Sequence, residues 1–330
     1  MAPLATILRY DVVTAPPGPG RRRKPRWSQA ASPVPLLDIQ ALKTQLDRVV
    51  ESGRPVVRAS AIARAAAGMA ALPAGALALT FDGSLADHHD LVLPLLLDRD
   101  LTATFFLAPA AIVGGRVMEA HKIHFLLAAA EDEDDVIAAI YDVLAERRHT
   151  STAPSFGKPP WQEQIADPAT KRRIEAAFVT RLLRSALPAG LRTAIIRRLF
   201  RTYVTSAEHS FAARLYLSPA QVQALAESGM ELGGCGNSGI NLQGVPRRQQ
   251  AEEIEASAGF LREQPATGDD GERLFAYPGG GWDEVTLDLL PRYGFTAAFT
   301  LHPGAVAAPS DPFRLPRYDA TADFDTALNP

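Results

Sequence analysis

Asp82 stands where a strand of the predicted sheet ends, which is the position at which α/β proteins bind their ligands. It follows the apolar, β-rich run Ala78–Phe81, and the next two residues, Gly83 and Ser84, are a turn signal. In a parallel sheet the ligand lies beyond the carboxyl ends of the strands. A carboxylate at that place can take part in acid–base chemistry if a second ionisable group lies within hydrogen-bond reach of a bound water.

Histidine and cysteine side chains, which bind transition metals, include two close pairs of histidines and a single cysteine. His121 and His124 are three residues apart and share a helical face, a spacing suited to metal ligands. His88 and His89 are adjacent and cannot share one face. For these four residues, packing in the core or exposure at the surface is the alternative interpretation. Cys235 lacks a nearby histidine that would activate it as a nucleophile, so we interpret it as a buried thiol.

Two strands and the helix between them position Asp82. Thr102–Leu107 is β-branched and aromatic and predicts the second strand, while Leu91–Leu97 supplies the apolar side of the connecting helix. A strand, a helix and a second strand form a βαβ unit and predict a parallel sheet. The same alternation predicts a first strand at 5–13 and later strands at 230–232, 275–277 and 295–301. The fold we expect is an irregular, incomplete (β/α) barrel.

The stretch around Asp82 resembles the first motif of the polysaccharide deacetylases, the NodB-homology carbohydrate esterases. That motif is usually written T-F-D-D-G and is followed by a helix and an A-T-F-F strand. The corresponding residues here are Thr80-Phe81-Asp82-Gly83-Ser84 and Ala103-Thr104-Phe105-Phe106. The first aspartate is present, and Gly83 replaces the second. The resemblance continues to Tyr318, apart from a helical segment in the middle of the chain.

The resemblance implies a divalent metal, usually zinc, that activates water for the hydrolysis of an acetamide. In the family the second aspartate of the first motif and two histidines of an H-x-x-x-H turn bind this metal, and the first aspartate is the base. By resemblance Asp82 is the base, and Gly83, Cys235 and Gly239 occupy the three ligand positions. Two glycines and one cysteine do not make a zinc site. We therefore expect degenerate metal positions and no metal cofactor, with a site rebuilt from the histidines as the alternative.

Four further residues are candidates for the same site. The third family motif, R-x-P-[YFW]-G, aligns with residues 273–280 without a clearly matching arginine. Tyr277 and Trp282 are candidates for stacking on a sugar face, with structural packing as the alternative. Asn237 flanks the second ligand motif and is a candidate for substrate binding. His302 follows a strand and is a candidate for the family's general acid.

The segment 116–214 departs from the alternation of strands and helices. It predicts helices near 121–127 and 135–148 and a strongly helical, basic run at 171–203. We therefore divide the chain into a first part of the barrel (1–115), a helical insertion (116–214) and a second part of the barrel (215–330). The basic face of the insertion could bind a polyanion or a protein partner, or it could be a solvated amphipathic surface.

Composition excludes several classes of function. The net charge of −3 gives no electrostatic reason for the whole chain to bind nucleic acid or a membrane surface. A single cysteine permits no intramolecular disulfide, and the first residues lack the apolar core of a signal peptide. The most apolar window, 61–79, is interrupted by arginine, glycine and proline, so we expect no membrane span and a cytoplasmic protein.

These observations lead to two hypotheses of different classes. In the first, the chain is a catalytically degenerate relative of the deacetylases in carbohydrate metabolism, which binds an amino-sugar glycan or partners an active enzyme. In the second, it is an active, divergent N-deacetylase that hydrolyses the acetamide of an amino sugar with Asp82 as the base. The loss of all three ligand side chains favours the first hypothesis, although membership of a family does not by itself establish activity.

Overall fold

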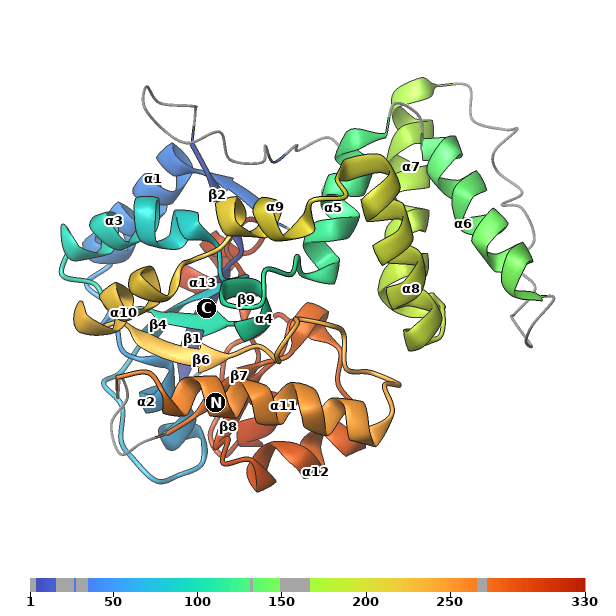
Figure 1. Cartoon of the computed structure of the whole chain (residues 1–330). Coiled ribbons are helices and arrows are strands. Elements are labelled where there is room, and N and C mark those ends of the chain that lie inside the picture. Colours follow the sequence, from blue (N-terminus) through green and yellow to red (C-terminus); the bar gives the residue numbers. More distant parts are fainter. Residues whose placement is uncertain are drawn as a thin grey trace. The chain divides into compact units, whose positions relative to one another are not determined.

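The computed structural model of the protein describes residues 4–15, 27, 35–130, 133–148, 167–265 and 272–329. These described residues fall into two compact units (Figure 1). The first unit comprises residues 1–25, 35–118 and 209–330, and the second comprises residues 26–34 and 119–208. The second unit thus combines a central stretch of the chain with a short segment from near its beginning.

Within its described residues, the first unit is built on a seven-stranded sheet in the order β8-β7-β6-β5-β4-β1-β9. All neighbouring strands in it are parallel. Its strands are β1 (Ala5–Tyr10), β4 (Ala76–Asp82), β5 (Thr104–Leu107), β6 (Glu231–Gly234), β7 (Leu274–Ala276), β8 (Ala297–Phe299) and β9 (Tyr318–Asp319). A separate parallel pair consists of β2 (Val12–Thr14) and β3 (Leu36–Asp38). The large sheet is open and curled, and helices connect its strands.

The central strands carry the sheet's core. Every residue of β1 and of β4 is buried, which matches their almost continuous apolar sequence and is typical of parallel strands covered on both faces. On one face, Leu79, Phe81 and Phe105 pack with apolar residues of α1 (Ile39–Glu51) and α3 (Leu93–Leu97) in one large hydrophobic cluster. This packing fixes the carboxyl ends of β1, β4 and β5 relative to one another.

The remaining helices lie in both units. Those of the first unit are α2 (Ala59–Ala66), the π-helix η1 (His88–Val92), α4 (Pro109–Ile112), α9 (Glu208–Leu215), α10 (Pro219–Glu227), α11 (Arg247–Arg262), the 3₁₀ turns η5 (Pro278–Gly280) and η6 (Pro312–Arg314), α12 (Glu284–Arg292) and α13 (Phe324–Leu328). The first residue of α9 belongs to the second unit. Those of the second unit are α5 (Glu119–Ala129), α6 (Glu133–Arg148), α7 (Pro168–Arg181), η2 (Leu182–Ala186), α8 (Ala189–Leu199) and η3 (Phe200–Val204). The helices of the second unit share a hydrophobic core of their own.

Two expected elements are interrupted in the structure. The strand expected at 5–13 is broken at Asp11, where the chain leaves the large sheet and begins the small one. The helix expected at 171–203 is broken between η2 and α8, where Leu187 and Pro188 have extended backbone. Proline restricts the residue before it and lacks an N–H group, so one continuous helix cannot pass this point.

Candidate functional site

Asp82 is the last residue of β4 and lies at the carboxyl end of the sheet, between the ends of β1 and β5. Its carboxylate is 11% exposed. Both oxygens accept hydrogen bonds from Arg317, Oδ1 from Nη1 at 2.8 Å and Oδ2 from Nη2 at 2.7 Å. This bidentate arrangement holds the carboxylate in one orientation.

Arg317 is itself fixed by the strand ends around it. Its Nε donates to the carbonyl oxygen of Thr300 at 3.1 Å, and Nη1 also donates to Oγ1 of Thr80 at 3.2 Å. The guanidinium lies over the ring of Phe106, 5.4 Å from its centroid, and the side chain is fully buried. These contacts place one positive charge next to Asp82 without access to solvent.

Arg317 is a residue of the candidate site that the sequence analysis did not identify. Arg273, which lies near the third motif, immediately precedes β7 and therefore stands at the amino end of that strand, away from Asp82. The segment with Arg317 reaches the site because it pairs with the end of β8: Leu315 donates to Ala298 and accepts from Thr300. The only signal in the sequence was the apolar residue and proline that precede Arg317 near the end of the chain.

A second charged cluster lies beside the first. Arg9 donates to the carboxylates of Asp11 and Asp319, each at 2.5 Å. Tyr10 and Phe81 are partners in the register of β1 and β4, so Asp11 follows directly beside Asp82. Burial, opposed by the positive charge of Arg9 and supported by the negative charges of Asp82 and Asp319, raises the pKa of Asp11 to about 6. Three carboxylates thus share two guanidiniums at this edge.

The backbone at the first ligand position does not suit an aspartate. Gly83 has a φ of 106°, a conformation that residues with a Cβ atom rarely adopt. The next residue, Ser84, also has a positive φ, and its Oγ accepts a hydrogen bond from the amide of Ala108 at 2.8 Å. The amide of Leu217 in turn donates to the Ser84 carbonyl. The turn after β4 is therefore fixed by its own contacts in a form that favours glycine.

The other two ligand positions are equally altered. Cys235 is buried, its amide donates to the carbonyl of Leu107, and burial raises the pKa of its thiol well above the usual range. Gly239 has a φ of 69°, and a Cβ atom built on it would lie only 2.3 Å from Cε of Met118. The methionine side chain thus fills the space into which a side chain at position 239 would project.

The four histidines are not assembled into a replacement site. Nε2 of His88 donates to the backbone oxygen of Asp11 at 2.7 Å, and burial lowers the pKa of this imidazole. His89 contacts the carboxylate of Asp90 at 3.0 Å. His121 and His124 belong to the second unit, where both lie against the ring of Trp27. Burial lowers the pKa of His124 to about 4.

The residues present do not fit the metal that the resemblance implies. A glycine with a positive φ, a buried thiol and a glycine covered by Met118 supply no set of three donors. Across the part of the chain that the structure describes, histidine, cysteine, aspartate and glutamate side chains form no group of three that could hold a metal ion.

The carboxylate of Glu253 holds the loop that carries Asn237 in place. Oε2 of Glu253, on α11, accepts hydrogen bonds from the amides of Asn237 and Ser238 at 2.9 and 2.8 Å. Oε1 accepts from the Ser238 hydroxyl at 2.7 Å. The Asn237 carbonyl accepts from the amide of Ala110, so this loop is also tied to the start of α4. Asn237 itself is half-buried at the carboxyl side of β6.

The two aromatic candidates differ in exposure. Tyr277 is 1% exposed, and its hydroxyl donates to the carbonyl of Phe313 at 2.7 Å, so in this structure it packs in the core and offers no face to a sugar. Trp282 is half-buried, its ring lies 5.6 Å from that of Tyr277, and the guanidinium of Arg314 lies 5.0 Å from its centroid. Of the two, Trp282 has the surface that carbohydrate stacking requires.

His302 lies just beyond the carboxyl end of β8 and is exposed. Its carbonyl accepts a hydrogen bond from the amide of Arg317, and its own amide donates to Oγ1 of Thr300. The backbone of His302 is therefore part of the segment that delivers Arg317 to Asp82. The described contacts place its imidazole in no hydrogen bond with Asp82 or with any other candidate residue.

The comparison with known proteins places the chain in a family. A family model described as polysaccharide deacetylase matches residues 128–298, just over half of the chain, and this stretch begins after Asp82 and Gly83. No curated protein matches the sequence. No helix among the described residues is long and apolar enough to cross a bilayer.

Solved structures of deacetylases share the fold. The Streptococcus pyogenes deacetylase PplD, solved in complex with acetate, has a TM-score of 0.58 and 14% identity over 100% of both chains. IcaB from Ammonifex degensii has a TM-score of 0.57 and 14% identity over 99% of this chain and 97% of its own. A de-N-acetylase from Aggregatibacter actinomycetemcomitans has a TM-score of 0.53 and 14% identity over 98% of each.

At this identity the similarity establishes the fold alone, and it confirms the incomplete (β/α) barrel that the sequence predicts. The matched family model extends from α5 to β8 and so includes the second ligand motif and the third motif. The chain belongs to the polysaccharide deacetylase family.

Proposed function

We propose that this protein is a catalytically degenerate member of its family, which binds a glycan at the carboxyl ends of the strands instead of deacetylating it. The observation that carries the proposal is the state of the ligand positions. Met118 fills the space beside Gly239, and the backbone of Gly83 disfavours any residue with a side chain. The family's metal-dependent reaction has no set of donors here.

The polar groups that remain at the strand ends suit the recognition of sugar hydroxyls. The carboxylates of Asp82, Asp11 and Asp319 are 11%, 16% and 22% exposed, so each is mostly buried and still partly accessible to solvent. A carboxylate that already accepts from arginine has further lone pairs for a hydroxyl donor. Trp282, which is half-buried and follows η5, is the candidate for the aromatic face. A few fixed polar groups and an aromatic surface are typical of ligand sites.

Binding of oligomers of N-acetylglucosamine, measured by isothermal titration calorimetry, tests this proposal. We expect binding without release of acetate, and a loss of about three- to tenfold in affinity for Trp282→Ala, since aromatic contacts are worth about 0.5–1.5 kcal/mol. Tyr141→Ala, a half-exposed aromatic residue of the second unit, is the matched control and should bind as the parent protein does. No binding to acetylated or deacetylated oligomers would refute the proposal.

An active N-deacetylase is the second candidate, because one element of the family's machinery is intact. Asp82 is present, and both of its oxygens are oriented by Arg317. Such an orientation would suit a base that acts on a bound water. Release of acetate from N-acetylglucosamine oligomers, abolished by Asp82→Asn with the glycan still bound, would establish this candidate and overturn the first.

A protein partner is a further role that we propose for the second unit. Arginines on the surfaces of its helices α7 and α8 and of η3 are exposed; they are Arg173, Arg181, Arg197 and Arg201. We infer that an acidic surface of an active enzyme would be the complementary partner. Replacement of these four residues by glutamate should abolish co-elution with that enzyme in gel filtration, and unchanged co-elution would exclude this surface.

A further inference from the structure

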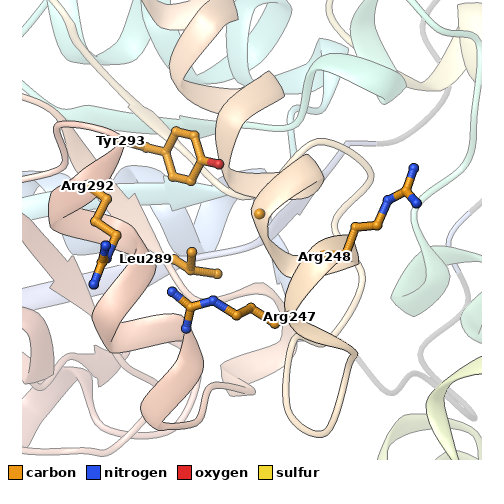
Figure 2. Close-up of a pocket in the computed structure, with 6 residues that line it drawn as sticks. Arg247, Arg248, Leu289, Arg292 and Tyr293 are labelled. Carbon is orange, nitrogen blue, oxygen red and sulfur yellow. The ribbon is translucent and has the colours of Figure 1, made fainter.

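A hollow between α11 and α12 lies apart from the residues of the site described above. It has a volume of about 700 Å³ and is open to solvent (Figure 2). The residues that line it are Arg247, Arg248, Ala251, Leu289, Arg292 and Tyr293. Three of its six lining residues are arginines and one is aromatic, so its chemistry differs from that of an ordinary gap between helices.

One carboxylate holds two of these arginines in place. Oδ2 of Asp288 accepts a hydrogen bond from Nη2 of Arg247, on the neighbouring helix. Oδ1 of Asp288 accepts from Nε and Nη2 of Arg292, at 3.1 and 2.8 Å. These hydrogen bonds, first those of Arg292 and then those of Arg247, lower the pKa of Asp288. The three side chains together carry a net charge of +1, because two guanidiniums share one carboxylate.

The two guanidiniums keep donors for a ligand. Each arginine has five N–H groups, and Asp288 accepts from one nitrogen of Arg247 and from two of Arg292. Among the described residues, no other acceptor takes the remaining N–H groups of these two side chains. The side chains are 53% and 64% exposed, so the free donors are accessible to a ligand in solution. Planar, pre-oriented guanidiniums are well suited to carboxylate and phosphate.

The rest of the hollow is apolar and aromatic. Leu289 lies between the two arginines in Figure 2, and the ring of Tyr293 stands above it. Tyr293 is half-buried, so part of its ring remains available. Leu289 is buried beneath these side chains, so the ring of Tyr293 is the surface that suits the C–H face of a sugar, and a bare inorganic anion would not use it.

From this geometry we infer a binding site for a sugar that carries an anionic group, either a carboxylate or a phosphate ester. The anionic group binds the guanidiniums of Arg247 and Arg292, and the sugar ring lies on Tyr293. The inference deepens the proposed function, on which it rests for the class of ligand, by adding a subsite outside the carboxyl ends of the strands.

Four probes test the site by titration calorimetry on the full chain: trigalacturonic acid, N-acetylglucosamine 6-phosphate, neutral tri-N-acetylglucosamine and inorganic phosphate. We expect at least one acidic sugar to bind in a manner that weakens as salt rises, since exposed charges are screened. Arg247→Ala and Arg292→Ala should each weaken it by about tenfold, the order expected when a charge-assisted hydrogen bond is lost. Tyr293→Ala should weaken the sugar and leave inorganic phosphate unchanged.

Arg248→Ala is the matched control. Arg248 lines the same hollow, but its Nε donates to Glu252 at 2.9 Å on its own helix, and Figure 2 shows its side chain directed away from the other two arginines. We expect this variant to bind acidic sugars as the parent protein does. Equal losses for all three arginine variants would show general attraction by positive charge and would overturn the site.

The remaining outcomes separate this inference from the proposed function. In one outcome the neutral oligomer binds and Trp282→Ala weakens it, whereas the acidic sugars bind no more tightly than the neutral oligomer and Arg247→Ala leaves their affinity unchanged. The inference then fails and the proposed function stands. Inorganic phosphate bound as tightly as the sugar phosphate would also overturn it, because the sugar would then contribute nothing. Folding of each variant is checked by its thermal unfolding midpoint.

Discussion

The carboxylate of Asp82 and the guanidinium of Arg317 meet where water hardly reaches. A buried pair of this kind is costly to break from one side, because the remaining charge keeps its desolvation cost without its partner. We predict that Arg317→Ala lowers the free energy of unfolding by about 3–5 kcal/mol. In a double-mutant cycle by urea denaturation, Asp82→Ala combined with Arg317→Ala should cost much less than the sum of the single variants. Additive costs would mean that the pair contributes no coupling.

Asp11 makes stability depend on pH in an unusual direction. Its pKa in the folded protein, about 6, is raised above that of an unfolded aspartate, mainly by burial. The native state therefore binds the proton more readily than the unfolded state does. Ionisation of Asp11 lowers the free energy of unfolding, and this loss of stability develops as pH rises from about 4 to above 6. We predict that Asp11→Asn gains stability relative to the parent over this interval, by at most about 3 kcal/mol. Urea unfolding at a series of pH values measures this, and a difference independent of pH would contradict it.

At the scale of the elements, α11 supports the loop at the end of β6 through Glu253. This carboxylate accepts hydrogen bonds from the amides of Asn237 and Ser238 and from the Ser238 hydroxyl. Glu253→Ala should cost about 2–4 kcal/mol, since buried donors lose their acceptor, and should speed amide exchange at those two residues. Glu252→Ala, next to it but exposed and paired with Arg248, should change neither. Unaltered exchange in Glu253→Ala would show that other contacts hold the loop.

Two glycines with similar backbone conformation allow the steric effect of Met118 at position 239 to be separated from the cost of the backbone conformation. Gly239 and Gly244 have φ of 69° and 71°, but a Cβ at Gly239 meets Met118 and a Cβ at Gly244 has nothing within 4 Å. Gly244→Ala should therefore cost about 1–2 kcal/mol from the left-handed backbone alone. Gly239→Ala should cost more, and Met118→Ala in the same chain should remove the excess. Equal costs at both glycines, measured by denaturation, would show that Met118 does not occupy the ligand space.

Local pattern was sufficient to predict the elements that surround Asp82. Apolar runs identified β4 and β5, and the leucines of 91–97 identified the helical connection between them, because both signals depend on neighbours in the sequence. The break at Pro188 was missed because the basic and apolar residues on either side continue the helical pattern. The strand β9 was missed because two residues are too few to show a period.

At the scale of the whole molecule, the parts that sequence could not supply are contacts between distant segments. Arg317 reaches Asp82 from 235 residues away, through the pairing of its segment with β8. Met118 packs against Gly239, although the whole helical segment lies between these two residues in the sequence. The sequence showed that the ligand side chains were absent; the structure adds that their places are filled or strained. The fold is shared with solved deacetylases at 14% identity, and the positions that the sequence resemblance aligns with metal ligands hold two glycines and a cysteine.

The central claim is that these positions no longer bind a metal, and metal content tests it most directly. The untagged full chain is saturated with zinc or with cobalt, desalted and analysed for metal per chain, beside an Asp82→Ala control. We predict that neither protein retains stoichiometric metal, because Gly83, Cys235 and Gly239 supply no set of donors. About one metal per chain, lost in Asp82→Ala, would contradict the claim and would show that the deacetylase site has been rebuilt from other residues.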